Sequence, residues 1–287
     1  MIERLAIIGV GLIGSSLSLA LKQAGAVGQV VGYGRNRRNL EKGIELGVID
    51  RFEASIAECV ADADVIVVAV PLGAMQPVFA ELKSNIKETA VITDVGSSKA
   101  SVVAAAAAEL GDDFPRFVPG HPIAGTEQSG VEAGFASLYQ NRRVILTPLQ
   151  QTAADAVEIV DQMWRHSGAI LEYLSVEHHD KVLAATSHLP HMLAYALVHH
   201  LSHLNDHDEI FRYAAGGFRD FTRIASSDPV MWRDVCLSNG DALVVLIEQY
   251  QRELDRIAVA IRDNNADELL KLFGRAKTER DSLIGNC

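Results

Sequence analysis

Six residues near the start of the chain have the types and the spacing that a phosphate-binding turn needs. Gly9-Val10-Gly11-Leu12-Ile13-Gly14 spells GxGxxG directly after an apolar run and directly before a helical pattern. In that setting the first glycine permits the tight turn, the second lets the backbone approach a pyrophosphate, and the third lets helix and strand pack closely. The positive end of the helix dipole then faces the phosphates. We therefore predict a dinucleotide site rather than a purely structural turn, with its contacts at Gly9, Gly11, Leu12, Ile13 and Gly14.

The residues after the second predicted strand bear on the ribose 2′ position of that dinucleotide. An NAD site usually has an aspartate or glutamate there, about 20 residues after the glycine motif. In this chain Gly34 stands at the expected place, and Arg35, Arg37 and Arg38 follow it. Because arginines pair with a 2′-phosphate and a carboxylate would repel it, the sequence favours NADP over NAD. The alternative is a solvated basic loop.

A histidine in a loop bracketed by proline and glycine is the candidate acid–base group. Residues 120–127 read GHPIAGTE and follow the strand-like run FVPG. Ligands of open α/β sheets bind at the carboxyl ends of the strands, where this loop is expected to lie. A neutral imidazole can accept a proton near pH 7, so His121 is our candidate for the reacting centre.

The elements that position these groups alternate between strand and helix from residue 1 to about residue 174. Most of the strand candidates are nearly continuous apolar runs, as strands buried on both faces of a parallel sheet should be. Helix-like stretches lie between them, and the repeated β-α-β order predicts a doubly wound parallel sheet of the Rossmann type. The strand candidates are residues 5–10, 29–33, 64–70, 90–95, 143–148 and 169–174.

From residue 175 to residue 287 the strand pattern is absent, and we predict an all-α C-terminal domain. Apolar residues recur there at spacings of four and three, which is typical of a long amphipathic helix with a heptad-like seam. Such a seam packs either inside its own domain or against a second subunit. The seam residues are Leu243, Ile247, Tyr250, Leu254, Ile257 and Ile261.

Composition argues against several classes of protein. The 287 residues suffice for two domains, and the formal net charge of -11 argues against binding to nucleic acid or to an anionic membrane. No apolar run approaches the ~20 residues that a membrane span needs, and the first strand begins too early to leave room for a signal peptide. The three cysteines are far apart and odd in number, which argues against a disulfide framework. We therefore expect a cytoplasmic protein whose partner is a small-molecule substrate.

Four further stretches occur in an order and spacing typical of one enzyme family. Residues 94–99 read DVGSSK, residues 121–127 HPIAGTE, residues 186–191 TSHLPH, and residues 216–232 GGFRDFTRIASSDPVMW. Together with GVGLIG, they resemble the prephenate and arogenate (cyclohexadienyl) dehydrogenases over nearly the whole chain. The resemblance implies an NAD(P)-dependent oxidative decarboxylation in tyrosine biosynthesis, in which hydride leaves ring C4 for the nicotinamide and a carboxylate departs as CO2. It also implies a homodimer formed through the helical domain.

The resemblance implies roles for individual residues as well. His121 would accept a hydrogen bond from the C4 hydroxyl, and Ser97 matches the family's serine that contacts this hydroxyl and helps to hold the histidine. Ser97 has a second interpretation, as the N-cap of a helix that begins near Lys99. Arg223 matches the family's carboxylate-binding arginine, which suits a dianionic substrate because a guanidinium can clamp a carboxylate bidentately. Trp232 matches a family aromatic residue, although a core tryptophan is the simpler interpretation.

The helical half is expected to add polar groups to the same pocket. His191 matches a family histidine that supports substrate binding. Ser187 can cap a helix that has Pro190 in its first turn, and His188 would then share a stripe with His191. The substrate-binding candidates are thus Arg223, His191, His188, Thr126 and Glu127. These residues do not discriminate between prephenate and arogenate.

Three other functions fit the residues less well. A β-hydroxyacid or 6-phosphogluconate-like dehydrogenase would need a lysine acid–base in the helical half, and between residues 175 and 210 there is only Lys181, without a glycine-rich setting. A non-catalytic nucleotide sensor would have no reason to combine the candidate residues His121, Ser97, His191 and Arg223. Metal binding is suggested by histidines at helical spacing, yet no cysteine or well-placed carboxylate joins them, so we predict no metal site. Those histidines are His199, His200, His203 and His207.

Overall fold

The computed structural model describes residues 1–83 and 85–284. Its contacts divide the chain into two compact units, the first running from Met1 to Gly240 and the second beginning at Asp241. Among the described residues, no helix is long and apolar enough to cross a membrane.

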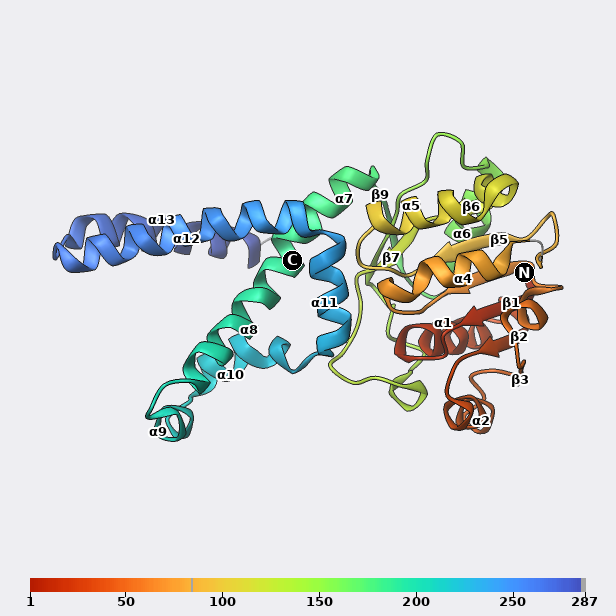
Figure 1. The fold of residues 1–287 in the computed structure, drawn as a ribbon, viewed down its shortest axis with the longest axis horizontal. Helices are drawn as coiled ribbons and strands as arrows, with labels where there is room; N and C mark the ends of the chain where they lie inside the picture. Colours follow the sequence, from red (N-terminus) through yellow and green to blue (C-terminus); the bar gives the residue numbers. More distant parts are fainter. Residues whose placement is uncertain (84, 285–287) are drawn as a thin grey trace. The chain divides into compact units, whose positions relative to one another are not determined.

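The first unit is built on a six-stranded parallel sheet with the strand order β3-β2-β1-β4-β5-β6 (Figure 1). This is the strand order of a dinucleotide-binding doubly wound sheet, so the predicted fold class is confirmed. Its strands are β1 (Ile2–Ile8), β2 (Val27–Tyr33), β3 (Arg51–Phe52), β4 (Val65–Val68), β5 (Val91–Asp94) and β6 (Phe117–Val118).

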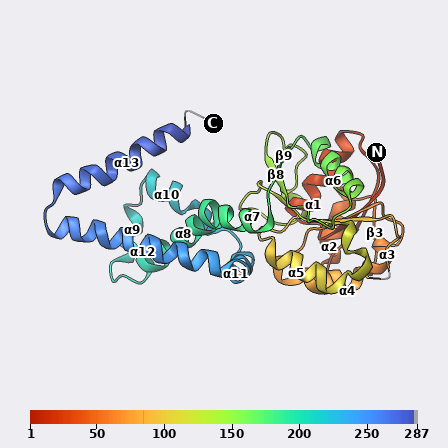
Figure 2. The same cartoon turned by 90° about the horizontal axis from the view of Figure 1, so that it is seen from above.

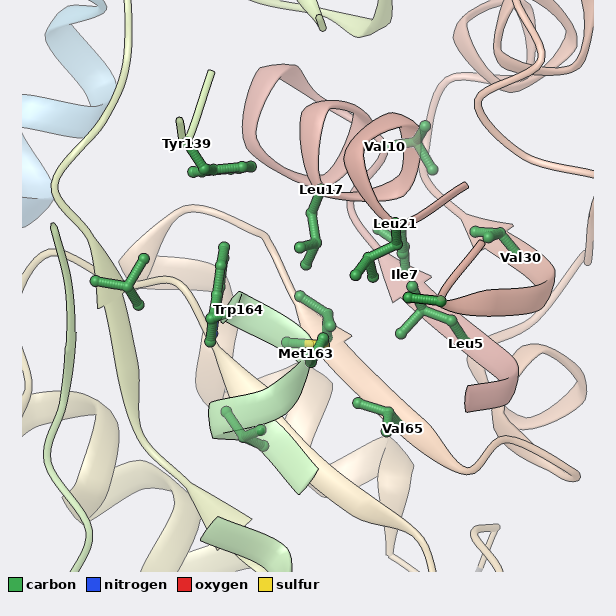
Figure 3. Packing of buried hydrophobic residues seen from close by; sticks show 14 of the residues in the cluster. Leu5, Ile7, Val10, Leu17, Leu21, Val30, Val65, Tyr139, Met163 and Trp164 are labelled. Carbon is green, nitrogen blue, oxygen red and sulfur yellow. The ribbon is translucent and has the colours of Figure 1, made fainter. Parts of the chain in front are cut away.

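Helices cover both faces of this sheet, as the continuous apolar strands require. In β1, Leu5 and Ile7 belong to one core cluster, and Ala6 and Ile8 to the other, because successive side chains of a strand point to opposite faces. Figure 2 shows α1 and α6 on one side of the sheet and α4 and α5 on the other. Figure 3 shows the first cluster, in which Leu17 and Leu21 of α1 lie over the β1 side chains. The helices are α1 (Leu12–Gln23), α2 (Arg37–Glu45), α3 (Ile56–Val60), α4 (Met75–Leu82), α5 (Ala100–Glu109) and α6 (Ala154–His166).

A second, three-stranded sheet follows, which the sequence did not reveal. It consists of β7 (Gly120–Pro122), β8 (Arg143–Leu146) and β9 (Ile170–Tyr173). β7 pairs with β8 in antiparallel orientation, and β8 pairs with β9 in parallel orientation. The strand candidates at residues 143–148 and 169–174 are therefore strands, but they do not extend the main sheet.

From Val176 onward the described chain is helical, which confirms the predicted all-α C-terminal half. α7 (Val176–Leu183) continues through a π-helical turn, Ala184–His188, into α8 (Leu189–Ser202). Pro190 stands in the first turn of α8 as expected, but the Ser187 side chain does not cap it, because the backbone is already helical at that point. The rest of this unit contains α9 (His207–Arg212), α10 (Gly216–Thr222), a 3-10 turn at Arg223–Ser226 and α11 (Pro229–Ser238).

The second unit is a helical hairpin of α12 (Gly240–Arg262) and α13 (Ala266–Ile284). Arg256 of α12 donates to Glu268 of α13 with an Nε–Oε1 distance of 2.9 Å. The predicted seam on α12 is not uniformly buried, since Leu243 is 3% exposed, Leu254 50% and Ile261 59%.

Candidate active site

The glycine-rich turn connects β1 to α1 at the carboxyl edge of the main sheet. Gly9 has φ +100°, and a Cβ at this position would lie 2.3 Å from the carbonyl oxygen of Ala69, directly after β4. A Cβ on Gly14 would lie 2.7 Å from the Gly9 carbonyl oxygen, so helix and strand approach each other closely there. At Gly11, by contrast, an added Cβ would meet nothing within 4 Å.

This turn has the features that a pyrophosphate needs. The first-turn amides of α1 have no partner within the helix, and neither a capping side chain nor an acidic residue occupies its start. The open space at Gly11 lies at this positive helix end. Gly9, Gly11, Leu12, Ile13 and Gly14 could thus hold the phosphates of a dinucleotide.

A segment that the sequence analysis did not single out packs against this turn. The Tyr139 hydroxyl donates to the carbonyl of Ile13 at 2.6 Å. The Asn39 side chain donates to the Val10 carbonyl at 2.6 Å and accepts from the Val131 amide at 3.1 Å. The segment that follows the HPIAGTE loop is therefore anchored on the glycine-rich turn.

The three candidate arginines lie at the end of β2 and the start of α2, and all are exposed. Arg37 is paired with Glu41 at 2.9 Å and lies over the ring of Phe52. Within the described residues, Arg35 and Arg38 form no ion pair. Their guanidinium groups could therefore pair with an anion.

A buried ion pair joins the main sheet to the second sheet beside His121, the candidate base. Asp94 ends β5, Gly120 begins β7, and both Asp94 and Lys99 are fully buried. The Lys99 Nζ lies 2.5 Å from the Asp94 Oδ2 and 2.7 Å from the Gly120 carbonyl oxygen. The Gly120 amide donates to the other Asp94 oxygen at 3.1 Å. This cluster fixes the backbone next to His121.

His121 lies on β7 and has a histidine partner that the sequence analysis missed. Its Nδ1 is 2.8 Å from the Nε2 of His179, a residue of α7. The His179 side chain is fully buried. The Nδ1 of His179 is in turn 2.8 Å from the Oδ1 of Asp180. These contacts make a continuous row from His121 to His179 to Asp180.

Asp180 also holds the beginning of α5. Its carboxylate accepts from the amides of Lys99 at 2.7 Å and Ala100 at 2.9 Å. The interpretation of Ser97 as the N-cap of this helix is therefore wrong, because an aspartate from α7 supplies the acceptor and no side chain in the α5 N-cap position does. Within the described chain, the Ser97 hydroxyl makes no hydrogen bond, so its predicted contact with a substrate hydroxyl stays a prediction.

Burial keeps these histidines neutral at ordinary pH. It lowers the pKa of His121 well below 6.5, and the neighbouring His179, Lys99 and His188 lower it further. Burial also lowers the pKa of His179. Burial alone would raise the pKa of Asp180, but the hydrogen bonds from His179 and the α5 amides lower it overall. The row therefore ends in a carboxylate and begins with a neutral imidazole.

His188 and His191 gather around Trp232 of α11. The rings of His191 and Trp232 stack at a centroid distance of 3.7 Å, and His188 meets Trp232 edge-on at 6.0 Å. The Nδ1 of His191 lies 2.8 Å from the Ser187 carbonyl oxygen, and the Nδ1 of His188 lies 3.3 Å from the Nδ2 of Asn239. Burial lowers the pKa of His188 to about 4. Trp232 is thus a member of this polar cluster rather than only a core residue.

Arg223 and Glu127, two predicted substrate-binding residues from opposite halves of the chain, form an ion pair. The Arg223 side chain is 63% exposed and that of Glu127 is 35% exposed, so both remain accessible to solvent. The neighbouring Thr126 is exposed, and its hydroxyl accepts from the amide of Gln128 at 3.2 Å. The HPIAGTE loop and the α10 region therefore meet.

Neither the lysine nor the histidine alternative gains support from the geometry. Lys181 is exposed on α7. In the histidine-rich end of α8, His203 Nδ1 lies 2.7 Å from the His199 carbonyl oxygen. Across residues 1–83 and 85–284 no group of three histidine, cysteine, aspartate or glutamate side chains could hold a metal ion.

A Rossmann sheet with this glycine-rich turn, together with a half-buried neutral histidine beside the carboxyl end of β5, defines a dinucleotide-dependent oxidoreductase. Two family models match the chain: the nucleotide-binding domain of prephenate dehydrogenase over residues 17–173, and its dimerization domain over residues 175–275. The chain belongs to the prephenate dehydrogenase family, and the predicted family is confirmed.

Individual relatives agree with this result. The chain is 38% identical to the cyclohexadienyl dehydrogenase of Zymomonas mobilis, over 98% of this chain and 96% of that protein. A crystal structure of prephenate dehydrogenase from A. aeolicus, in complex with hydroxyphenyl propionate and NAD+, superposes with a TM-score of 0.92 at 36% identity and covers 99% of each chain. The arogenate dehydrogenase of Synechocystis superposes with a TM-score of 0.80 at 26% identity, covering 98% of this chain and 99% of that one. The chain is accordingly a dehydrogenase that uses a nicotinamide cofactor.

Proposed function

We propose that this protein oxidises and decarboxylates a cyclohexadienyl substrate, prephenate or arogenate, with His121 as the hydrogen-bond acceptor at the C4 hydroxyl. The observation that carries the proposal is the neutral imidazole of His121, whose neighbour Gly120 is held at the carboxyl end of β5 by Asp94 and Lys99. The nicotinamide supplies the hydride acceptor. As hydride leaves C4, His121 takes the hydroxyl proton and the C4 oxygen becomes a carbonyl. Loss of the C1 carboxylate as CO2 then returns an electron pair through the ring to the C4 oxygen, which regains the proton from His121 as the ring becomes aromatic.

The polar cluster around Trp232 suits the side chain of such a substrate. The Trp232 indole N–H is buried without a hydrogen-bond partner in the described part of the chain, and a buried donor of this kind favours an acceptor-bearing ligand. His191, whose Nδ1 faces the Ser187 carbonyl, keeps its Nε2 free to interact. Arg223 can exchange Glu127 for a substrate carboxylate.

Absorbance at 340 nm tests the reaction directly, with prephenate and arogenate each combined with NAD and with NADP. We expect reduction of the nicotinamide in at least one combination, and the fastest combination identifies substrate and cofactor together. Absence of reduction in all four would refute the proposed function.

Arg223→Ala is expected to raise KM for the substrate by about 10- to 100-fold while changing kcat little. A charge-assisted hydrogen bond to a carboxylate contributes about 1.5–3 kcal/mol, and this one is formed equally in the ground and transition states. Arg219→Ala, on the exposed face of α10, is the matched control and should leave KM unchanged. Steady-state kinetics measure both variants; an unchanged KM in Arg223→Ala would remove the proposed anchor.

We also propose that the cofactor is NADP rather than NAD. Support comes from Arg35 and Arg38, exposed side chains that form no ion pair within the described residues and follow a strand whose end has no acidic residue. Arg37 lies beside them but is already engaged by Glu41.

The double variant Arg35→Ala/Arg38→Ala is expected to raise KM for NADP by about 10-fold or more, because it removes cations that would pair with the 2′-phosphate. KM for NAD in the same variant is the internal control and should stay within about twofold. Equal changes for the two cofactors would show that these arginines do not read the 2′ position.

The helical half, residues 175–287, serves in our proposal as a substrate-binding and dimerisation domain. The description of the matching family model supports the dimer. Large apolar side chains that the second unit leaves exposed support it as well, because a partner subunit would shield them from water. They include Leu254, Ile261, Leu270 and Phe273.

A further inference from the structure

His179 and Asp180 form a row with His121 that the motifs did not predict. The row is short and buried: His179 is fully buried, Asp180 is 6% exposed, and the two contacts are each 2.8 Å. The hydroxyl of Ser97, the residue expected to hold His121, makes no hydrogen bond in the described part of the chain. The partner of His121 is therefore His179.

The hydrogen-bond donors around Asp180 determine which atom donates and which accepts in each hydrogen bond of the row. A carboxylate can only accept hydrogen bonds, and the amides of Lys99 and Ala100 already donate to it. The Nδ1 of His179 must then carry a proton and donate to Asp180. A neutral His179 consequently has a bare Nε2, which accepts from the Nδ1–H of His121.

We propose that His179 and Asp180 are positioning residues that hold His121 in the Nδ1–H tautomer, with its Nε2 lone pair free to accept a proton. The role in turnover rests on the proposed function, because it matters only if His121 is the proton acceptor. The opposite tautomer would place a proton on Nε2 and would leave His121 unable to accept one.

The two faces of α7 provide a matched pair of test positions. His179 is buried and contacts His121, whereas His178 precedes it in sequence and is exposed. His179→Leu removes the acceptor for the His121 Nδ1–H. His179→Gln places an amide oxygen near the former Nε2 and retains an acceptor. His178→Leu is the control for a histidine-to-leucine change on the same helix.

Kinetics form the first part of the experiment. We expect His179→Leu to lower kcat by about 100-fold with KM for the substrate within about threefold, because substrate anchors are untouched while the base loses its orientation. His179→Gln should keep kcat within about 10-fold of the wild type, and His178→Leu should equal the wild type. Wild-type turnover in His179→Leu would overturn the proposal.

The second part observes the tautomer without relying on activity. Nitrogen NMR of protein labelled with ¹⁵N-histidine distinguishes a protonated from a bare ring nitrogen, and His121→Asn assigns the His121 signals by their loss. We expect a protonated Nδ1 and a bare Nε2 on His121 in the wild type and in His179→Gln, and a mixture of tautomers in His179→Leu. A protonated Nε2 in the neutral wild type would overturn the proposal. An inactive wild type would instead refute the proposed reaction, so the two failures are distinguishable.

Discussion

Replacing His121 by asparagine is expected to lower kcat by on the order of 10²–10⁴ while leaving KM for the substrate nearly unchanged. The asparagine amide lies near the former Nδ1 and can still donate to the Nε2 of His179, so the local packing should persist. What is lost is the ring Nε2, the proposed acceptor for the C4 hydroxyl proton. Steady-state kinetics with the preferred substrate and cofactor measure the change.

A histidine outside the site provides the control for this substitution. His199 is exposed near the end of α8, and His199→Asn should turn over like the wild type. Circular dichroism of both variants checks that the fold is intact. If His121→Asn retained the wild-type kcat, the acid–base role would have to be assigned to a different group.

Lys99→Met is expected to lower the free energy of unfolding by about 3–5 kcal/mol, because it leaves the fully buried Asp94 carboxylate without its cation. Surface ion pairs contribute far less, typically 0–1 kcal/mol, because water and salt screen them. The same substitution should reduce activity, since Lys99 also fixes the Gly120 carbonyl next to His121. Denaturant unfolding measures the stability change.

A second lysine–aspartate pair in the same unit makes the comparison quantitative. Lys87 pairs with Asp64, and the two side chains are 36% and 34% exposed. Lys87→Met should therefore cost no more than about 1 kcal/mol. Equal decreases in the free energy of unfolding in Lys87→Met and Lys99→Met would contradict this prediction, because they would show that burial of the Lys99–Asp94 pair does not increase the cost of removing its lysine.

The sequence by itself determined the features that depend on neighbouring residues. Nearly continuous apolar runs predicted most of the strands, and glycines at fixed spacing predicted the turn between β1 and α1, because both follow from local backbone geometry. The family motifs likewise singled out His121, Arg223 and His191 from the sequence alone. The β-α-β alternation predicted a doubly wound parallel sheet, but β3 and β6 were not among the strand candidates and the strand order was not predicted.

Only the tertiary structure decided which distant side chains meet. His179 contacts His121 across 58 positions, and Arg223 pairs with Glu127 across 96. The sequence offers a weak signal for the first contact, the HHD triplet at residues 178–180, and no spacing rule for either. The second sheet was missed for the same reason, since apolar strands look alike whether they pair with the main sheet or with β7. Burial keeps the histidines neutral and shields the Lys99–Asp94 ion pair from water. This burial arises because segments far apart in the sequence pack against one another, and local sequence does not show which segments do so.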